Sequence, residues 1–90
     1  MNSRTTREFR ELLAALPLHI RRQARESYRL FRTNPRHPSL HFKRVHRAPP
    51  IFSARVGIGF RAVAVREGNT LVWFWIGAHA DYDRLIERLS

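Results

Sequence analysis

The 90 residues suffice for one domain and leave little room for a second. A hydrophobic share of 43% is typical of a folded chain, and the lack of cysteine excludes disulfides, thiolate catalysis and thiolate metal sites. No apolar run approaches membrane-spanning length, and residues 1–11 are charged rather than signal-like. We therefore expect a single cytoplasmic domain over residues 1–90.

The charge balance is strongly basic. Seventeen Lys and Arg residues against seven Asp and Glu give a formal net charge of +10, and Lys43 is the single lysine. The planar guanidinium of arginine binds phosphate or carboxylate through two parallel hydrogen bonds. The composition therefore predicts a partner that is RNA, DNA or an acidic protein. A merely solvated arginine-rich surface is the alternative interpretation.

The first half of the chain has helical periodicity. A first helix is predicted from Ser3, a suitable N-cap, to the residue before Pro17, with one apolar face formed by Phe9, Leu12, Leu13 and Leu16. Pro17 then opens a second helix, which ends at Asn34-Pro35. Its predicted buried face consists of Ile20, Ala24, Ser27, Tyr28 and Phe31. The short link between them predicts an antiparallel helical hairpin.

The second half has a period of two, which indicates strands. The predicted strands are roughly 40–46, 51–57, 60–66 and 70–76. Turns at 57–59 and 67–69 make neighbouring strands antiparallel, so the expected sheet is a four-stranded meander. A short closing helix is predicted from His79 to Leu89, on the helical spacing of Tyr82, Leu85, Ile86 and Leu89.

Alternation along the strands assigns side chains to the two faces of the sheet. Small alanines at 54, 62 and 64 favour the face on which helices approach closely. Arg55 and Arg61 then lie together on the opposite, open face. Trp73 and Trp75 are expected to share one side of the last strand, and the pattern does not decide which side carries the helices.

Several of these positions match a known signature. They read Arg55-Val56-Gly57, Phe60-Arg61-Ala62 and Trp73-Phe74-Trp75-Ile76-Gly77-Ala78-His79, preceded by the junction Leu16-Pro17 and the helix end Asn34-Pro35. Over roughly residues 8–86 the chain resembles the RelE/ParE superfamily of type II toxin–antitoxin toxins, and especially its ParE-like toxin subgroup.

The resemblance implies an α+β, RelE/ParE-like (microbial-RNase-like) fold, with the helical hairpin packed on the sheet. Members of the family begin with a strand before the first helix, whereas this chain is expected to start directly in that helix. The sheet would then be one strand short and would leave an open edge that a partner could complete.

The resemblance also implies catalytic residues. A metal-free ribonuclease needs a base, a cation for the charged phosphorane and an acid. Arg61 and Arg55 are the candidate phosphate clamps, His79 is the candidate acid–base group, and Asp81 is its candidate assistant. The alternatives are arginines that pair with surface carboxylates, and a histidine and aspartate that merely stabilise the start of the last helix.

A second group of residues is expected to contact nucleic acid. This group consists of Lys43, His41, His46, Trp73, Trp75 and Tyr82. For the histidines and the lysine a solvated role stays open, and for the aromatic residues a core or antitoxin-binding role stays open. The histidine spacing matches no metal pattern, so we expect no metal and no cofactor.

The resulting functional hypothesis is a toxin that cuts mRNA on the ribosome and inhibits translation, neutralised by a cognate acidic antitoxin. Two alternatives remain: a ParE-type poison of DNA gyrase, and a degenerate, non-catalytic toxin that serves only as an antitoxin-binding module.

Overall fold

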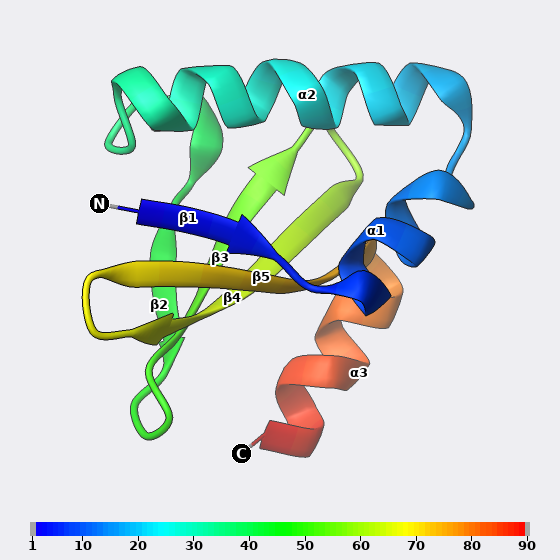
Figure 1. The fold of residues 1–90 in the computed structure, drawn as a ribbon. Helices are drawn as coiled ribbons and strands as arrows, with labels where there is room; N and C mark the ends of the chain where they lie inside the picture. Colours follow the sequence, from blue (N-terminus) through cyan, green and yellow to red (C-terminus); the bar gives the residue numbers. More distant parts are fainter. Residues whose placement is uncertain (1, 90) are drawn as a thin grey trace.

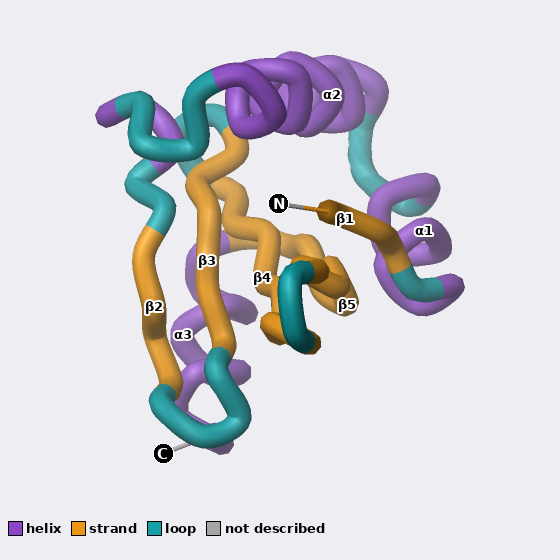
Figure 2. Tube along the Cα trace, turned by 60° about the vertical axis from the view of Figure 1, so that its left-hand side comes forward, coloured by secondary structure: helices purple, strands orange, loops and turns teal. Residues whose placement is uncertain are grey.

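The structure is a computed structural model and describes residues 2–89. Its strands and helices follow in the order β1 (Asn2–Thr5), α1 (Arg7–Ala14), α2 (Leu18–Thr33), the 3₁₀ turn η1 (Pro38–Leu40), β2 (Lys43–His46), β3 (Ile51–Val56), β4 (Phe60–Glu67), β5 (Thr70–Ala78) and α3 (His79–Leu89). The sheet order is β1-β5-β4-β3-β2, as Figures 1 and 2 show. The α+β class with two N-terminal helices and a C-terminal helix is confirmed, but the sheet is five-stranded and mixed rather than a four-stranded meander.

The additional strand is β1, where the sequence predicted the start of a helix. It runs parallel to β5, in register from Asn2 opposite Thr70 to Thr5 opposite Trp73. Ser3 is not an N-cap, because its Oγ accepts a hydrogen bond of 2.7 Å from Nε1 of Trp73. A short polar strand has no apolar periodicity, so the pattern could not reveal it. The prediction that the sheet is one strand short was therefore wrong.

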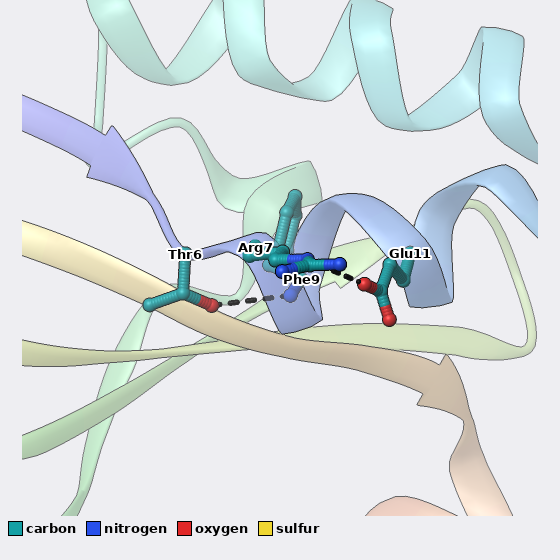
Figure 3. A network of polar contacts seen from close by, with 4 residues as sticks. All are labelled: Thr6, Arg7, Phe9 and Glu11. Atoms are coloured by element: carbon teal, nitrogen blue, oxygen red, sulfur yellow. Dashed lines mark hydrogen bonds and ion pairs between the residues drawn. The ribbon is translucent and has the colours of Figure 1, made fainter.

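Helix α1 begins one turn later than predicted, at a different cap. The Oγ1 of Thr6 accepts a hydrogen bond of 3.1 Å from the backbone N–H of Phe9, which satisfies a donor of the first turn (Figure 3). One turn of the helix is further bridged by Arg7, whose Nε donates to Glu11 at 3.0 Å. As predicted, α1 stops before Pro17 and α2 follows it directly.

The first core lies between helices α1 and α2 and one face of the sheet. The sheet contributes small residues, Ala54, Ala62 and Ala64, which are 0–7% exposed. The helices contribute Phe9 and Phe31 to the same cluster. Small side chains on the strands allow these rings to approach the sheet closely, so the predicted helix-covered face is confirmed.

The second core lies on the opposite face, which α3 covers. Tyr82, Leu85, Ile86 and Leu89 of this helix pack on the sheet with Ile51 and Val63. The expectation that Arg55 and Arg61 lie on an open face was therefore wrong. The apolar stripe of α3 needs burial, and the valines and aromatic rings of this face supply the matching surface.

A β-bulge in β5 separates the two tryptophans. Val63 pairs with Trp75 and the next residue of β4, Ala64, pairs with Trp73, so β5 has one extra residue between them. Trp73 consequently lies in the first core and Trp75 in the second. The prediction that they share one side was wrong, because a bulge shifts the alternation of side chains by one position.

Both predicted hairpin turns are present, and glycine has a clear role in each. Gly57 has φ +59° and Gly68 has φ +61°, a backbone conformation that residues with a Cβ rarely adopt. Strand β2 starts at Lys43 rather than near residue 40, because Pro38–Leu40 forms η1 and His41 follows it with φ 44°. Between residues 2 and 89 no helix is both long and apolar enough to cross a bilayer.

Candidate functional site

Arg61 of β4 is a buried cation beneath α3. It is 8% exposed, and its Nη1 lies 3.4 Å from Oγ of Ser53. The Tyr82 ring covers it, with the Arg61 Cζ 5.4 Å from the ring centroid, and the Tyr82 hydroxyl donates to the same Oγ at 3.1 Å. Within residues 2–89, Arg61 forms no ion pair and its Nε has no hydrogen-bond partner. A buried charge without a carboxylate partner lowers the stability of the fold. Arg61 therefore differs from an arginine that is held in a structural ion pair.

Arg55 is the cross-strand neighbour of Arg61, but its guanidinium group has other partners. Its Nε donates to the carbonyl of Gly57 at 2.8 Å, and its Nη1 lies 3.5 Å from Nε2 of His41. The two arginines are adjacent along the sheet, whereas their charged groups are held at separate places. The structure thus places Arg55 beside His41, at the corner formed by η1 and the β3–β4 turn.

His79 is the first residue of α3 and is half exposed. Its backbone N–H donates to the carbonyl of Gly59 at 2.9 Å, which anchors the start of the helix to the β3–β4 turn. Its ring centroid lies 5.6 Å from that of Tyr82. Because the same Tyr82 ring covers Arg61, one aromatic ring contacts both the imidazole and the guanidinium.

The carboxylate beside His79 is that of Asp83. Its Oδ2 lies 3.3 Å from Nδ1 of the imidazole, whereas Asp81 pairs with Arg84 at 3.2 Å. The sequence prediction named Asp81 and missed Asp83. The spacing contained the signal, because residues four apart in a helix lie on one face whereas residues two apart do not.

The remaining predicted residues are distributed over both faces of the sheet. Lys43 is paired with Ser53, the hydrogen-bond partner of Arg61, in the β2–β3 register and is exposed at the sheet edge. His46, also on β2, has its Nδ1 3.0 Å from the carbonyl oxygen of Pro49. Trp75 lies against Tyr82 with ring centroids 6.5 Å apart, while Trp73 is 5% exposed in the first core.

The arrangement brings together three of the predicted residues, Arg61, His79 and Tyr82, at the junction of α3 with the sheet. We call these three residues the Arg61 cluster. A guanidinium that is not neutralised can stabilise an anion, and an imidazole held by a carboxylate can move a proton. No group of three His, Asp or Glu side chains in the described part of the chain is arranged to hold a metal ion.

A separate cleft of about 430 Å³ lies on the opposite face, between α2, β1 and the sheet. Its wall is mainly apolar and includes Phe9, Phe31 and Trp73, while Arg21 and Arg25 line it from α2. No lining residue is acidic, and the buried Nε of Arg21 has no hydrogen-bond partner in the described part of the chain. This cleft differs in character from the Arg61 cluster because it offers apolar surface with cations beside it.

Solved structures show the same fold. The chain is similar to the archaeal RelE of a RelE–RelB complex from Pyrococcus horikoshii OT3, with a TM-score of 0.68 and 12% identity over 86% of this chain and 92% of that one. It is also similar to a copper-bound point-mutant toxin from Helicobacter pylori, with a TM-score of 0.59 and 13% identity over 90% of this chain and 97% of that one. The fold is therefore RelE-like. No curated protein matches the sequence.

The amino-acid sequence establishes the family of this protein. A model of the ParE-like toxin domain matches residues 18–84, which is most of the chain and includes α2, strands β2 to β5 and the first half of α3. The chain belongs to this family and is a RelE/ParE-family toxin of a toxin–antitoxin system.

Proposed function

We propose that this toxin is a metal-free endoribonuclease that cuts mRNA on the ribosome and so inhibits translation. The observation that supports this proposal is the buried Arg61 guanidinium, which has no carboxylate partner and shares the Tyr82 ring with His79. A cation kept free of acidic partners is suited to the extra negative charge of a phosphorane. If Arg61 had only a structural role, an apolar residue at this position would make the folded protein more stable.

In the proposed reaction, the neutral imidazole of His79 removes the proton of a ribose 2′-hydroxyl while that oxygen attacks the adjacent phosphorus. Asp83 orients the ring and stabilises the imidazolium that forms. Arg61 binds the non-bridging oxygens, the bond from phosphorus to the 5′-oxygen breaks, and water protonates the leaving oxygen. The products are a 2′,3′-cyclic phosphate and a 5′-hydroxyl.

Access to Arg61 requires a movement of α3. Tyr82 is 6% exposed and covers the guanidinium, so a phosphate reaches it only when the helix turns away from the sheet. The hydrogen bond from His79 to Gly59 holds the beginning of α3 in place. We therefore propose that the helix pivots near this bond, which keeps the imidazole at the site while Arg61 is uncovered.

Ribosomes programmed with a defined mRNA test this proposal. Purified wild-type protein should cut the message, whereas His79→Ala and Arg61→Gln should leave it intact and should no longer inhibit growth. His37→Ala is a suitable control, since that histidine contacts Ser39 in η1 and not the cluster. Intact mRNA with a toxic wild-type protein, together with undiminished toxicity of His79→Ala, would exclude the nuclease.

The burial of Arg61 favours a second candidate function, a poison of DNA gyrase. Such a toxin needs a protein-binding surface and no access to Arg61. Helix α3 could then stay packed over the Arg61 cluster, which is buried in the structure. DNA cleavage and a DNA-damage response without arrest of translation would select this candidate. A protein that does not inhibit growth at all would instead be a degenerate toxin that only binds its antitoxin.

The partner of this toxin is its antitoxin, and we propose that an acidic segment of that protein enters the cleft beside α2. The apolar wall fits aliphatic side chains, and Arg21 and Arg25 fit carboxylates next to them. Replacing both arginines by Glu should weaken the complex and abolish the rescue of growth. The same replacement at Arg84 and Arg88 of α3 should not.

A further inference from the structure

The turn between β3 and β4, residues 57–59, contacts helices on both faces of the sheet. The carbonyl of Gly59 accepts a hydrogen bond of 2.9 Å from the backbone N–H of His79, the first residue of α3. On the other side the turn lies against α2 (Figure 1), where a Cβ at Gly57 would overlap the side-chain oxygen of Gln23. The turn therefore connects α2 with the start of the helix that carries the candidate acid–base group.

The side chain of Arg55 holds the beginning of this turn. Its Nε donates to the carbonyl of Gly57 at 2.8 Å, at a residue whose φ of +59° bends the backbone sharply. The same guanidinium is restrained from η1, because its Nη1 lies 3.5 Å from Nε2 of His41. Hydrogen bonds from a charged donor are stronger than those from a neutral one. Arg55 thus limits the conformations that the turn can adopt.

The place of His79 relative to the sheet depends on this turn. Its ion-pair partner Asp83 and the ring of Tyr82 both belong to α3, so neither contact joins the imidazole to the sheet. Within residues 2–89, the hydrogen bond to Gly59 is the one polar contact that connects His79 with a strand or its turn. A change in the turn would therefore displace the start of α3 and the imidazole together.

We propose that Arg55 is a positioning residue for His79 and acts through the turn between β3 and β4. The inference rests on the proposed nuclease and adds to it a residue that contacts neither the RNA nor the imidazole. This role differs from the phosphate clamp expected from the sequence, since it requires the Nε–H of Arg55 and not its charge. A displacement of a reacting group by about 1 Å can slow a reaction by about 10²-fold.

The turn between β4 and β5 contains the same arrangement without a link to α3. Arg66 donates from Nε to the carbonyl of Gly68 at 3.0 Å, and Gly68 has φ +61°. The carbonyl of the next residue, Asn69, accepts a hydrogen bond of 2.9 Å from the backbone N–H of Asn2 in β1. Arg66 is therefore a matched control for Arg55, because it makes the same local bond at a turn that anchors β1 and not His79.

The first test measures the anchor of α3 directly. The exchange of the His79 backbone N–H with deuterated solvent is followed by NMR in wild type, Arg55→Met and Arg66→Met. Arg55→Met should accelerate this exchange by about tenfold or more, the factor expected when a hydrogen bond from a charged donor is lost. Arg66→Met should leave it unchanged. Unchanged exchange in Arg55→Met, or equal acceleration in both variants, would overturn the proposal.

The second test separates the donor of Arg55 from its charge. The side-chain amide nitrogen of glutamine occupies the same place along the side chain as Nε of arginine, so Arg55→Gln keeps an N–H for Gly57 and loses the charge. Arg55→Lys keeps the charge, but its ammonium lies one bond beyond that place. On ribosomes carrying a defined mRNA, Arg55→Gln should retain most of the cleavage rate, while Arg55→Lys and Arg55→Met should cut more slowly. The concentration of ribosomes that gives half the maximal rate should stay the same.

The opposite order of Arg55→Gln and Arg55→Lys would overturn the proposal, since it would show that the charge contacts the phosphate. The two tests also separate this inference from the proposed nuclease. A wild-type protein that cuts no mRNA refutes the nuclease, whereas the exchange of the His79 N–H still decides the role of Arg55. Cleavage by the wild type together with unchanged exchange in Arg55→Met refutes only the positioning role.

Discussion

The ring of Tyr82 lies over the guanidinium of Arg61, with the arginine Cζ 5.4 Å from the ring centroid, and the two side chains share Oγ of Ser53 as a polar partner. This contact joins α3 to the middle of the sheet through a charged group rather than through apolar packing alone. A cation–π contact and one long hydrogen bond compensate only part of the cost of burying a cation. The arrangement thus weakens the packing of α3 on the sheet, which is consistent with the movement of α3 that we propose.

Replacing Arg61 by Met should separate stability from function. The thioether side chain has a similar length and no charge, so we expect the free energy of unfolding to stay the same or to rise by about 1–3 kcal/mol. Growth inhibition should be lost. Urea denaturation and a plate assay measure the two effects. A loss of more than about 2 kcal/mol would show that Arg61 has a structural role.

Two substitutions of Tyr82 distinguish its hydroxyl from its ring. Tyr82→Phe removes the hydrogen bond to the buried Ser53 and should cost about 1 kcal/mol, while Tyr82→Ala removes the ring and should cost about 3–5 kcal/mol. Because the proposed reaction assigns no chemistry to the hydroxyl, Tyr82→Phe should still cut mRNA. Complete loss of cleavage in a folded Tyr82→Phe protein would contradict that reaction.

The two aspartates near His79 should differ in their effect on cleavage. Asp83→Asn removes the carboxylate that orients the imidazole and should slow cleavage, whereas Asp81→Asn removes only the pairing with Arg84. His79→Ala should slow it further, by about 10²–10⁴-fold, the usual contribution of a general acid–base group. Both pairs are exposed, so each of the three substitutions should change stability by less than about 1 kcal/mol. A greater defect in Asp81→Asn than in Asp83→Asn would reverse this assignment.

Gly77 of β5 should not tolerate a side chain. A Cβ at this position would lie 2.7 Å from Cζ2 of Trp75, whose ring also lies against Tyr82. We expect Gly77→Ala to destabilise the protein by about 1–3 kcal/mol, since the ring must leave its place. Gly59→Ala is the matched control, because a Cβ there meets nothing within 4 Å. Thermal unfolding of the two variants compares them directly, and equal stability would refute the packing argument.

The sequence predicted those elements whose apolar residues have a clear period. Helix α2, strands β3 to β5 and helix α3 are found close to the expected residues, and the alanines at 54, 62 and 64 identified the face that α1 and α2 cover. Strand β1 was missed because its four residues are polar and its partner strand lies far along the chain. Its pairing is a tertiary effect that local periodicity does not record.

Two features of the site could not be predicted from the pattern of apolar residues either. Nearly every residue of β5 is apolar, so no polar side chain marks where the bulge moves Trp75 to the other face. The covering of Arg61 depends on which face α3 takes, and both faces of the sheet offered apolar surface. Asp83 could have been predicted from the sequence, because it follows His79 by four residues in the same helix.

The pairing of β1 with β5 has a consequence for the order of folding. Asn2 lies beside Thr70, so β1 has no neighbouring strand until β5 has been synthesised. Contacts between such distant residues slow folding, because a long loop must close before they form. The sheet of this toxin therefore receives β1 only once β5 is available, and until then the edge of β5 that β1 covers stays unpaired.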